Sequence, residues 1–197
     1  GYLELIKFVD DNFGLKSSLK LELLNNLGFS YSALKDYDNA LKYYLLSEEL
    51  SELYKSKRNL LTNKMNIGDI YFWRGDIKKS NEYYKEALKY KEYSPKQTQI
   101  FLFASLSKTE AFLGNYELAL LYGNEGLKIS EKFHGINHPS NLQILDSLAL
   151  ANSSSGNTEE KFKNLITIYN IINDYSKGYL KENFNADPNE YFQQIYS

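Results

Sequence analysis

Apolar residues recur at every third or fourth position along most of the chain, a spacing that predicts amphipathic helices. Leu24, Leu27 and Tyr31 fall on one helix face, and Ala40 and Tyr44 fall on one face after a short polar break. Segments of this length separated by two-residue turn signals are typical of antiparallel helix hairpins. The pattern predicts an all-α chain without a sheet.

The hairpin pattern repeats along the sequence. Gly28 of the first copy lies 40 residues before Gly68 of the second. The glycines at the turns, Gly75, Gly114 and Gly156, set the later copies at offsets of 39 and 42 residues. Four copies at nearly constant spacing predict a solenoid, because a hairpin of this kind buries its apolar face only by stacking on a neighbour.

The turns carry a recognisable chemistry. In three copies, a glycine in the left-handed conformation is expected to end the first helix, and an Asp or Asn to cap the second. These pairs are Gly75-Asp76, Gly114-Asn115 and Gly156-Asn157. Small residues recur where the two helices of a copy must approach closely: Gly28 with Ala40, Gly68 with Ser80, and Ser107 with Ala119.

The copies predict one array over residues 1–197. A cap followed by proline, as in Ser94-Pro95 and His138-Pro139, recurs at Asp187-Pro188 and predicts the start of another helix. The expected divisions are the second helix of a truncated repeat (1–16), repeats over 17–57, 58–94, 95–137 and 138–178, and the start of a further repeat or a capping helix (179–197).

The residues of the first copy are similar to the tetratricopeptide repeat, whose pattern is carried here by Leu24, Leu27-Gly28, Tyr31, Ala40 and Tyr44. The copies are longer than the usual repeat of about 34 residues. They resemble the long variety of kinesin light chains and of many bacterial multi-repeat proteins. The resemblance implies a right-handed α-solenoid of stacked antiparallel hairpins, whose concave side binds partner segments, and it carries no catalytic motif.

Composition excludes several classes of protein. The chain has 23 basic and 25 acidic residues and a net charge of −2, which argues against a polybasic nucleic-acid binder. The absence of cysteine excludes disulfides, thiolate zinc sites and a cysteine nucleophile within these residues. No apolar run approaches the roughly 20 residues that span a bilayer, so we expect no membrane association and a cytoplasmic location.

Two candidate chemistries have simpler interpretations. His134 and His138 suggest a metal site, but Gly135 and Pro139 place them in a turn, where His138 is expected to cap the next helix. The acidic residues lie among lysines on outer helices, where pairing and solubility account for them. We therefore expect no metal, no cofactor and no enzymatic activity.

A second stripe on the first helix of each copy points away from the packing stripe. Aromatic, amide and charged residues recur there, and aromatic side chains are enriched at binding surfaces. Any single aromatic has a competing interpretation as core between adjacent repeats. The predicted partner-binding residues are Asn25, Asn26, Phe29, Asn66, Asp69, Phe72, Trp73, Phe101, Lys108 and Phe112.

The resemblance adds a role for two of these residues. Asn26 and Asn66 match the place where long-repeat families hold a peptide backbone through side-chain amides, whereas Ser105 and Ser147 stand there in the later copies. The predicted function is a protein- or peptide-binding module. The alternative is a regulatory arm of a larger bacterial protein, such as a caspase-like protease, a histidine kinase or a transcription factor.

Overall fold

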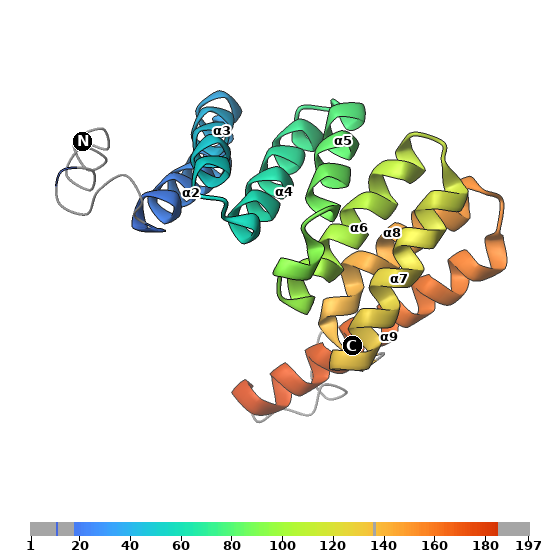
Figure 1. The fold of residues 1–197 in the computed structure, drawn as a ribbon. Coiled ribbons are helices and arrows are strands. Elements are labelled where there is room, and N and C mark those ends of the chain that lie inside the picture. The colour runs from blue at the N-terminus through green and yellow to red at the C-terminus, as the bar shows by residue number, and fades with distance from the viewer. Residues whose placement is uncertain (1–10, 12–17, 136, 185–197) are drawn as a thin grey trace. The chain divides into compact units, whose positions relative to one another are not determined.

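The structure, a computed structural model, describes residue 11, residues 18–135 and residues 137–184. Within these residues there is no strand, so the all-α prediction is confirmed. The α-helices are α2 (Ser18–Ala33), α3 (Tyr37–Leu53), α4 (Lys57–Trp73), α5 (Ile77–Leu88), α6 (Lys96–Phe112), α7 (Tyr116–His134), α8 (Leu142–Ser154) and α9 (Thr158–Phe184) (Figure 1). Two short 3₁₀ helices, η1 (Lys91–Tyr93) and η2 (Pro139–Asn141), lie in the connections.

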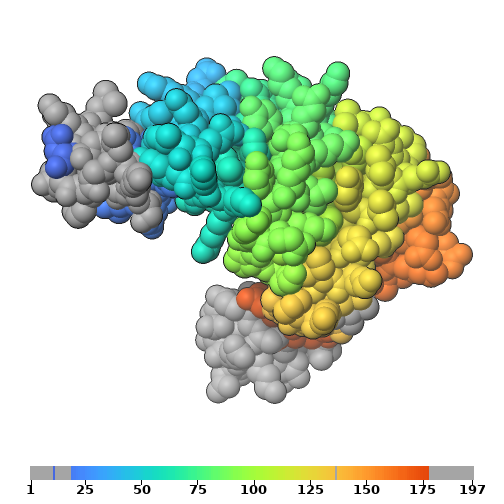
Figure 2. Space-filling view, viewed as in Figure 1, coloured from blue at the N-terminus to red at the C-terminus, as the bar shows by residue number. Residues whose placement is uncertain are grey.

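The chain divides into two compact units, Gly1–Leu102 and Phe103–Ser197. In the first unit α2 packs against α3, α3 against α4, and α4 against α5. Ala40 and Tyr44 of α3 form a buried cluster with Ile67 and Ile70 of α4. Side chains fill the spaces between the ribbons of α3, α4 and α5, which form one continuous surface in Figure 2.

In the second unit α7 packs against α8, and α8 against α9. Gly123 and Gly126 of α7 leave room for Leu148 and Ile144 of α8. A Cβ atom at Gly123 would lie 2.4 Å from Leu148 Cδ2, and one at Gly126 would lie 2.1 Å from Ile144 Cδ1. The absence of a side chain at these two positions of α7 therefore sets how closely the two helices approach.

The predicted turn glycines have the expected conformation. Gly75, Gly114 and Gly156 have φ values of 82°, 80° and 79°. In the first copy Lys35 takes this place with φ 59°, a conformation that costs a side-chain-bearing residue more than it costs glycine. The two-residue turn is therefore retained where the glycine is absent.

The predicted caps are confirmed in part. Asp76 accepts a hydrogen bond from the backbone N–H of Lys79 at 3.2 Å. Asp36, which was not among the predicted caps, accepts one from the backbone N–H of Asn39 at the same distance. Asn157 Oδ1 lies 3.4 Å from the backbone nitrogen of Glu160. The prediction is wrong for Asn115, whose side chain caps nothing; its amide Nδ2 donates to Glu110 Oε2 at 2.7 Å.

The close approach predicted at Gly28 and Gly68 has a different partner from the expected one. A Cβ atom on Gly28 would lie 2.5 Å from the ring of Tyr44, and one on Gly68 would lie 2.7 Å from the ring of Tyr84. The glycines make room for tyrosine rings of α3 and α5. At Gly28 the nearest side chain is therefore Tyr44, one helical turn after the predicted neighbour Ala40.

The pairs α2–α3, α4–α5, α6–α7 and α8–α9 follow the predicted order of hairpins. The exact repeat boundaries stay predictions. The expected helix over 1–16 and the helix start at Asp187-Pro188 lie outside the described residues, apart from residue 11. In the described part of the chain, no helix is both long and apolar enough to cross a membrane.

Candidate partner-binding surface

The predicted aromatic residues of the first unit lie on first helices of the hairpins and are largely exposed. Phe29 near the end of α2 is 70% exposed, Trp73 at the end of α4 is 66% exposed, and Phe101 of α6 is 41% exposed. Phe72 is half-buried and meets Trp73 edge to face, with ring centroids 5.6 Å apart. Phe29 and Trp73 therefore lie outside the core, which removes the competing interpretation for these two residues.

The predicted amides lie on the same helices and differ in their partners. Asn25 Nδ2 donates to Ser47 Oγ and to the backbone oxygen of Leu21, each at 3.1 Å. Asn66 Nδ2 lies 3.5 Å from Asn25 Oδ1, so the two amides of successive repeats meet. Asn26 is exposed. Asn25 thus serves the packing of α2 on α3, whereas Asn26 presents its amide to solvent.

Asp69 is the acidic residue of this surface, and its carboxylate is held by a tyrosine. Tyr84 Oη donates to Asp69 Oδ1 at 2.5 Å, and the Tyr84 ring reaches this position by crossing Gly68, which has no side chain. Burial raises the pKa of Asp69 to about 6. Burial, and then the charge of Asp69, raise the pKa of Tyr44 of α3 to about 12.

Two predicted residues belong to the second unit, both on α6. Lys108 Nζ lies 3.8 Å from Asp146 Oδ2 of α8 in a partly exposed ion pair. Phe112, at the end of α6, is 54% exposed. In this unit the predicted residues are therefore a lysine paired with an aspartate of another first helix, and one exposed aromatic ring.

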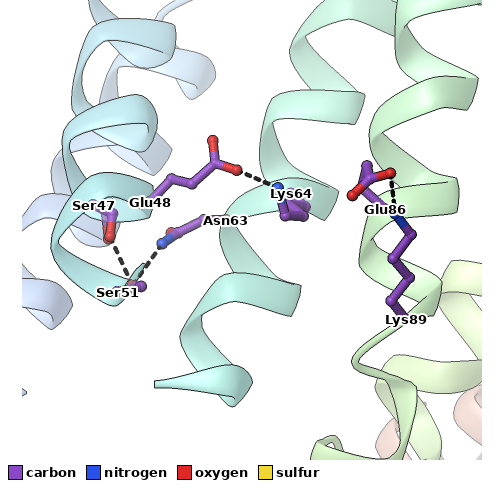
Figure 3. Close-up of polar contacts among 7 residues, drawn as sticks. All are labelled: Ser47, Glu48, Ser51, Asn63, Lys64, Glu86 and Lys89. Atoms are coloured by element: carbon purple, nitrogen blue, oxygen red, sulfur yellow. Dashed lines mark hydrogen bonds and ion pairs between the residues drawn. The ribbon is translucent and has the colours of Figure 1, made fainter. Parts of the chain in front are cut away.

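Sequence reasoning passed over Lys64, a charged residue in a core position. Leu24, Phe103 and Leu145 occupy the same place in the other copies and are buried. Lys64 is 9% exposed, and its Nζ lies 2.5 Å from Glu48 Oε1 of α3. Figure 3 shows this pair bridging α3 and α4. A lysine on the apolar packing stripe was the available signal in the sequence.

The ion pair lies beside a cavity of about 540 Å³. Its lining comes from α3, α4 and α5: Glu48, Lys64, Glu82, Tyr83, Lys85 and Glu86. Uncharged groups near the ion pair form two consecutive hydrogen bonds. Asn63 Nδ2 donates to Ser51 Oγ at 3.1 Å, and Ser51 Oγ donates to the backbone oxygen of Ser47 at 2.7 Å (Figure 3). Polar contacts therefore hold α3 to α4 alongside the apolar cluster.

The two histidines lie at the connection between α7 and α8. Their rings stack with centroids 4.6 Å apart. His138 Nδ1 accepts a hydrogen bond from the backbone N–H of Ser140 at 3.1 Å, so the predicted capping role of His138 is confirmed. Over the described ranges 18–135 and 137–177, no three His, Cys, Asp or Glu side chains come together as metal ligands.

The acidic pair at the start of α9 is engaged with a lysine. Lys163 Nζ lies 2.9 Å from Glu159 Oε1 and 2.6 Å from Glu160 Oε1. Hydrogen bonding to Lys163 lowers the pKa of Glu159, and both carboxylates raise the pKa of Lys163. These exposed pairs have the helical spacing of ordinary surface salt bridges.

Comparison with known families agrees with this geometry. Residues 19–92, which span α2 to η1, match the tetratricopeptide repeat family. Residues 19–92 therefore carry tetratricopeptide repeats. The matched range holds the two hairpins with the tyrosine-over-glycine contacts and most of the predicted binding residues.

A bacterial relative has a similar sequence over most of this chain. It is response regulator aspartate phosphatase I of Bacillus subtilis (strain 168), which is 25% identical over 159 residues. The alignment covers 81% of this chain and 39% of the relative. The chain thus spans well under half the length of that protein.

Solved tetratricopeptide-like structures share the fold. A putative kinesin light chain with nearly identical TPR-like repeats from Podosopora anserina superimposes with a TM-score of 0.72 at 14% identity, covering 89% of this chain and 85% of that one. BtubC (BKLC) from P. vanneervenii superimposes with a TM-score of 0.70 at 16% identity, covering 79% and 64%. The predicted tetratricopeptide-type solenoid is confirmed by these likenesses.

Proposed function

We propose that the first helices of this tetratricopeptide array bind an extended segment of a protein partner. The observation that carries the proposal is the exposure of Phe29 and Trp73, at 70% and 66%, on first helices that also carry the amides of Asn26 and Asn66. Large aromatic side chains without a place in the core are poor choices for a merely solvated surface and are common anchors at interfaces.

The polar groups of this surface suit a peptide. A side-chain amide offers one acceptor and two donors, so it satisfies the backbone of an extended segment without reading its sequence. Asp69, between Asn66 and Trp73 in sequence, offers a carboxylate to a donor of the bound segment. Lys108 and Phe112, which belong to the second unit, offer a charge and an aromatic ring of the same kinds. In this proposal the aromatic residues supply affinity and the amides supply orientation.

The same proposal assigns the chain no catalysis of its own, no cofactor, and a cytoplasmic location. It makes the partner a protein or peptide rather than a nucleic acid or a membrane, because basic and acidic residues are nearly balanced. The partner segment belongs to another protein or to another part of the full-length chain.

A second candidate is a regulatory arm of a larger bacterial protein. The relative from Bacillus subtilis is a response regulator aspartate phosphatase, and this chain spans 39% of its length. In that case the bound segment controls an activity located outside these residues. The two candidates use the same surface. They differ in whether binding of the segment also changes an activity located outside these residues.

Intrinsic fluorescence tests the proposed surface, because Trp73 is the only tryptophan. A library of extended peptides is selected on the intact chain, and the best binders are titrated against the wild type, Trp73→Ala and Phe29→Ala. We expect Trp73 emission to respond to the peptide. Each truncation is expected to weaken binding by about 2 kcal/mol or more, measured by calorimetry, as for a central aromatic anchor.

Phe133→Ala is the matched control, because Phe133 is 54% exposed and lies on a second helix, α7. This variant is expected to bind peptide like the wild type. If peptides bind Trp73→Ala and Phe29→Ala as tightly as the wild type, this surface is not the binding site. If Trp73→Ala instead melts far below the wild type while binding is unchanged, Trp73 is a packing residue.

A further inference from the structure

The cavity between α3, α4 and α5 is lined mainly by charged side chains. Its volume of about 540 Å³ lies within the range of small-ligand sites, roughly 300–1,000 Å³. Among the described residues, its lining consists of Glu48, Lys64, Glu82, Tyr83, Lys85 and Glu86. Ligand sites are usually lined by apolar groups with a few polar ones, so a lining dominated by charged groups indicates a charged occupant.

The second unit has uncharged residues at the two places that form the buried ion pair. The turns at residues 36 and 115 lie 79 residues apart, and those at 75 and 156 lie 81 residues apart. By these offsets Leu127 of α7 takes the place of Glu48, and Leu145 of α8 takes the place of Lys64. Leu145 is 2% exposed and Leu127 is half-buried. Since two leucines serve at these places, packing alone does not account for the charged pair in the first unit.

Carboxylates outnumber ammonium groups in the lining by three to two. Lys64 is 9% exposed and its Nζ lies 2.5 Å from Glu48 Oε1, so its charge is balanced within the chain. In Figure 3 Lys64 of α4 lies between Glu48 of α3 and Glu86 of α5. Carboxylates therefore reach the cavity from both α3 and α5, which favours a cation over an anion as the occupant.

Helix α5 brings two carboxylates to the cavity one turn apart. Glu82 and Glu86 have the i, i+4 spacing at which like charges destabilise a helix. Lys89 Nζ lies 2.5 Å from Glu86 Oε1, but Lys89 is outside the lining, and an exposed ion pair of this kind contributes little to stability. A cation bound in the cavity relieves the repulsion between the two carboxylates.

Tyr83 gives the lining an aromatic ring close to a carboxylate. Burial, and then the charge of Glu48, raise the pKa of Tyr83. Its ring stacks on Tyr71 with centroids 5.5 Å apart, and this stacking holds the ring in place. A guanidinium group is planar, is less strongly hydrated than an ammonium group, bonds carboxylates in a bidentate manner and stacks on aromatic rings. The carboxylates and the tyrosine ring together therefore favour arginine over lysine.

We propose that this cavity binds the guanidinium group of an arginine residue from a protein partner, held between Glu48 of α3 and Glu82 and Glu86 of α5. The lining reaches the surface at Glu82 and Lys85, which are exposed, so a long side chain can enter while its backbone stays outside. The site shares no residue with the predicted partner-binding surface and stands independently of it.

NMR of the isotope-labelled, intact chain tests the site with small arginine derivatives. N-acetyl-L-argininamide resembles an arginine residue within a chain, and N-acetyl-L-citrullinamide has nearly the same shape without the charge. We expect the arginine derivative to shift backbone amide resonances around the lining in a saturable way. The citrulline derivative is expected to bind roughly tenfold or more weakly, as the loss of charge-assisted hydrogen bonds requires.

Variants of the lining test the sign of the charge that is recognised. Glu82→Gln/Glu86→Gln is expected to weaken binding of the arginine derivative roughly tenfold or more, whereas Lys85→Gln, which removes a like charge, is expected to strengthen it. Glu159→Gln/Glu160→Gln makes the same change of charge on α9 and is the matched control, expected to bind like the wild type. Circular dichroism checks that each variant keeps its helices.

Three results would overturn the proposal. Absent shifts around the lining, or equal shifts with the citrulline derivative, would mean that the cavity does not recognise a guanidinium group. Wild-type affinity in Glu82→Gln/Glu86→Gln, or an equal loss in the α9 control, would mean that the arginine derivative binds elsewhere or through overall charge. Free L-arginine binding much more tightly than N-acetyl-L-argininamide would mean that the occupant is the amino acid and not a residue of a protein.

Discussion

At Asp69, burial of the carboxyl group disfavours its charged form and raises its pKa. Asp69 is half-buried on α4, and its carboxylate accepts a hydrogen bond from Tyr84 of α5. Removing a carboxylate from water disfavours its charged form, which is why its pKa rises from 3.8 to about 6. A group with a raised pKa stabilises the folded state below its unfolded pKa, and this contribution is lost as the pH rises through the folded pKa.

We therefore predict that Asp69 lowers stability as the pH rises from about 4.5 to about 7, an interval that includes its folded pKa. A shift of about two pKa units corresponds to a loss of roughly 2 kcal/mol over this interval. Urea unfolding of the wild type and Asp69→Asn at the two pH values measures it, because asparagine keeps an acceptor for Tyr84. The expected result is a smaller loss in Asp69→Asn, and an equal pH dependence in both proteins would contradict it.

At the scale of the helical hairpin, close packing depends on the missing side chain of Gly28. A Cβ atom there would lie 2.5 Å from the Tyr44 ring, and Tyr44 is fixed between α2 and α4. Gly28→Ala is therefore expected to lower the free energy of unfolding by about 1–3 kcal/mol, as overpacking does. Asn26→Ala, an exposed change on the same helix, serves as the control. Equal urea midpoints for the two variants would show that the contact relaxes freely.

The buried ion pair of Lys64 and Glu48 also joins elements. The free-energy cost of removing two charges from water often exceeds the gain from their mutual attraction. A protein in which uncharged residues replace such a pair is therefore frequently as stable as the original. We predict that Lys64→Leu/Glu48→Gln unfolds at the same urea concentration as the wild type or higher. Lys64→Leu alone leaves the Glu48 charge unpaired and is expected to lower the free energy of unfolding by about 3–5 kcal/mol. A double variant as unstable as the single one would show that the pair itself stabilises the contact of α3 with α4.

At the scale of the whole molecule, the connection between α7 and α8 provides a test of metal independence. His138 Nδ1 already accepts a hydrogen bond from the backbone of Ser140, and His134 stacks on the same ring. We expect neither a chelator nor zinc to change the melting temperature of the chain, measured by calorimetry. A rise with zinc that follows the mass-action law for a specific site, and that disappears in His134→Ala, would contradict this expectation.

The binding surface could be predicted only in part. Phe29 and Trp73 are exposed as expected, because helical periodicity alone places them opposite the packing stripe. The role of Asn25 was not predictable, since its partners include Ser47, 22 residues away, and Asn66, 41 residues away. The number and orientation of hydrogen bonds to a side-chain amide depend on which helices become neighbours.

Periodicity and backbone preference are local properties that repetition makes visible in every copy, so the helices, their order in hairpins and the left-handed turn glycines follow from the sequence alone. What lies opposite each polar side chain depends on tertiary packing. Asp69 meets Tyr84 across 15 residues and Lys64 meets Glu48 across 16, and neither pair has a spacing of three or four residues that would mark it in the sequence. The Lys64–Glu48 contact forms where one hairpin stacks on the next, and the Asp69–Tyr84 contact forms where α4 packs on α5 within a hairpin. Both contacts, and the raised pKa of Asp69, therefore exist only in the folded chain.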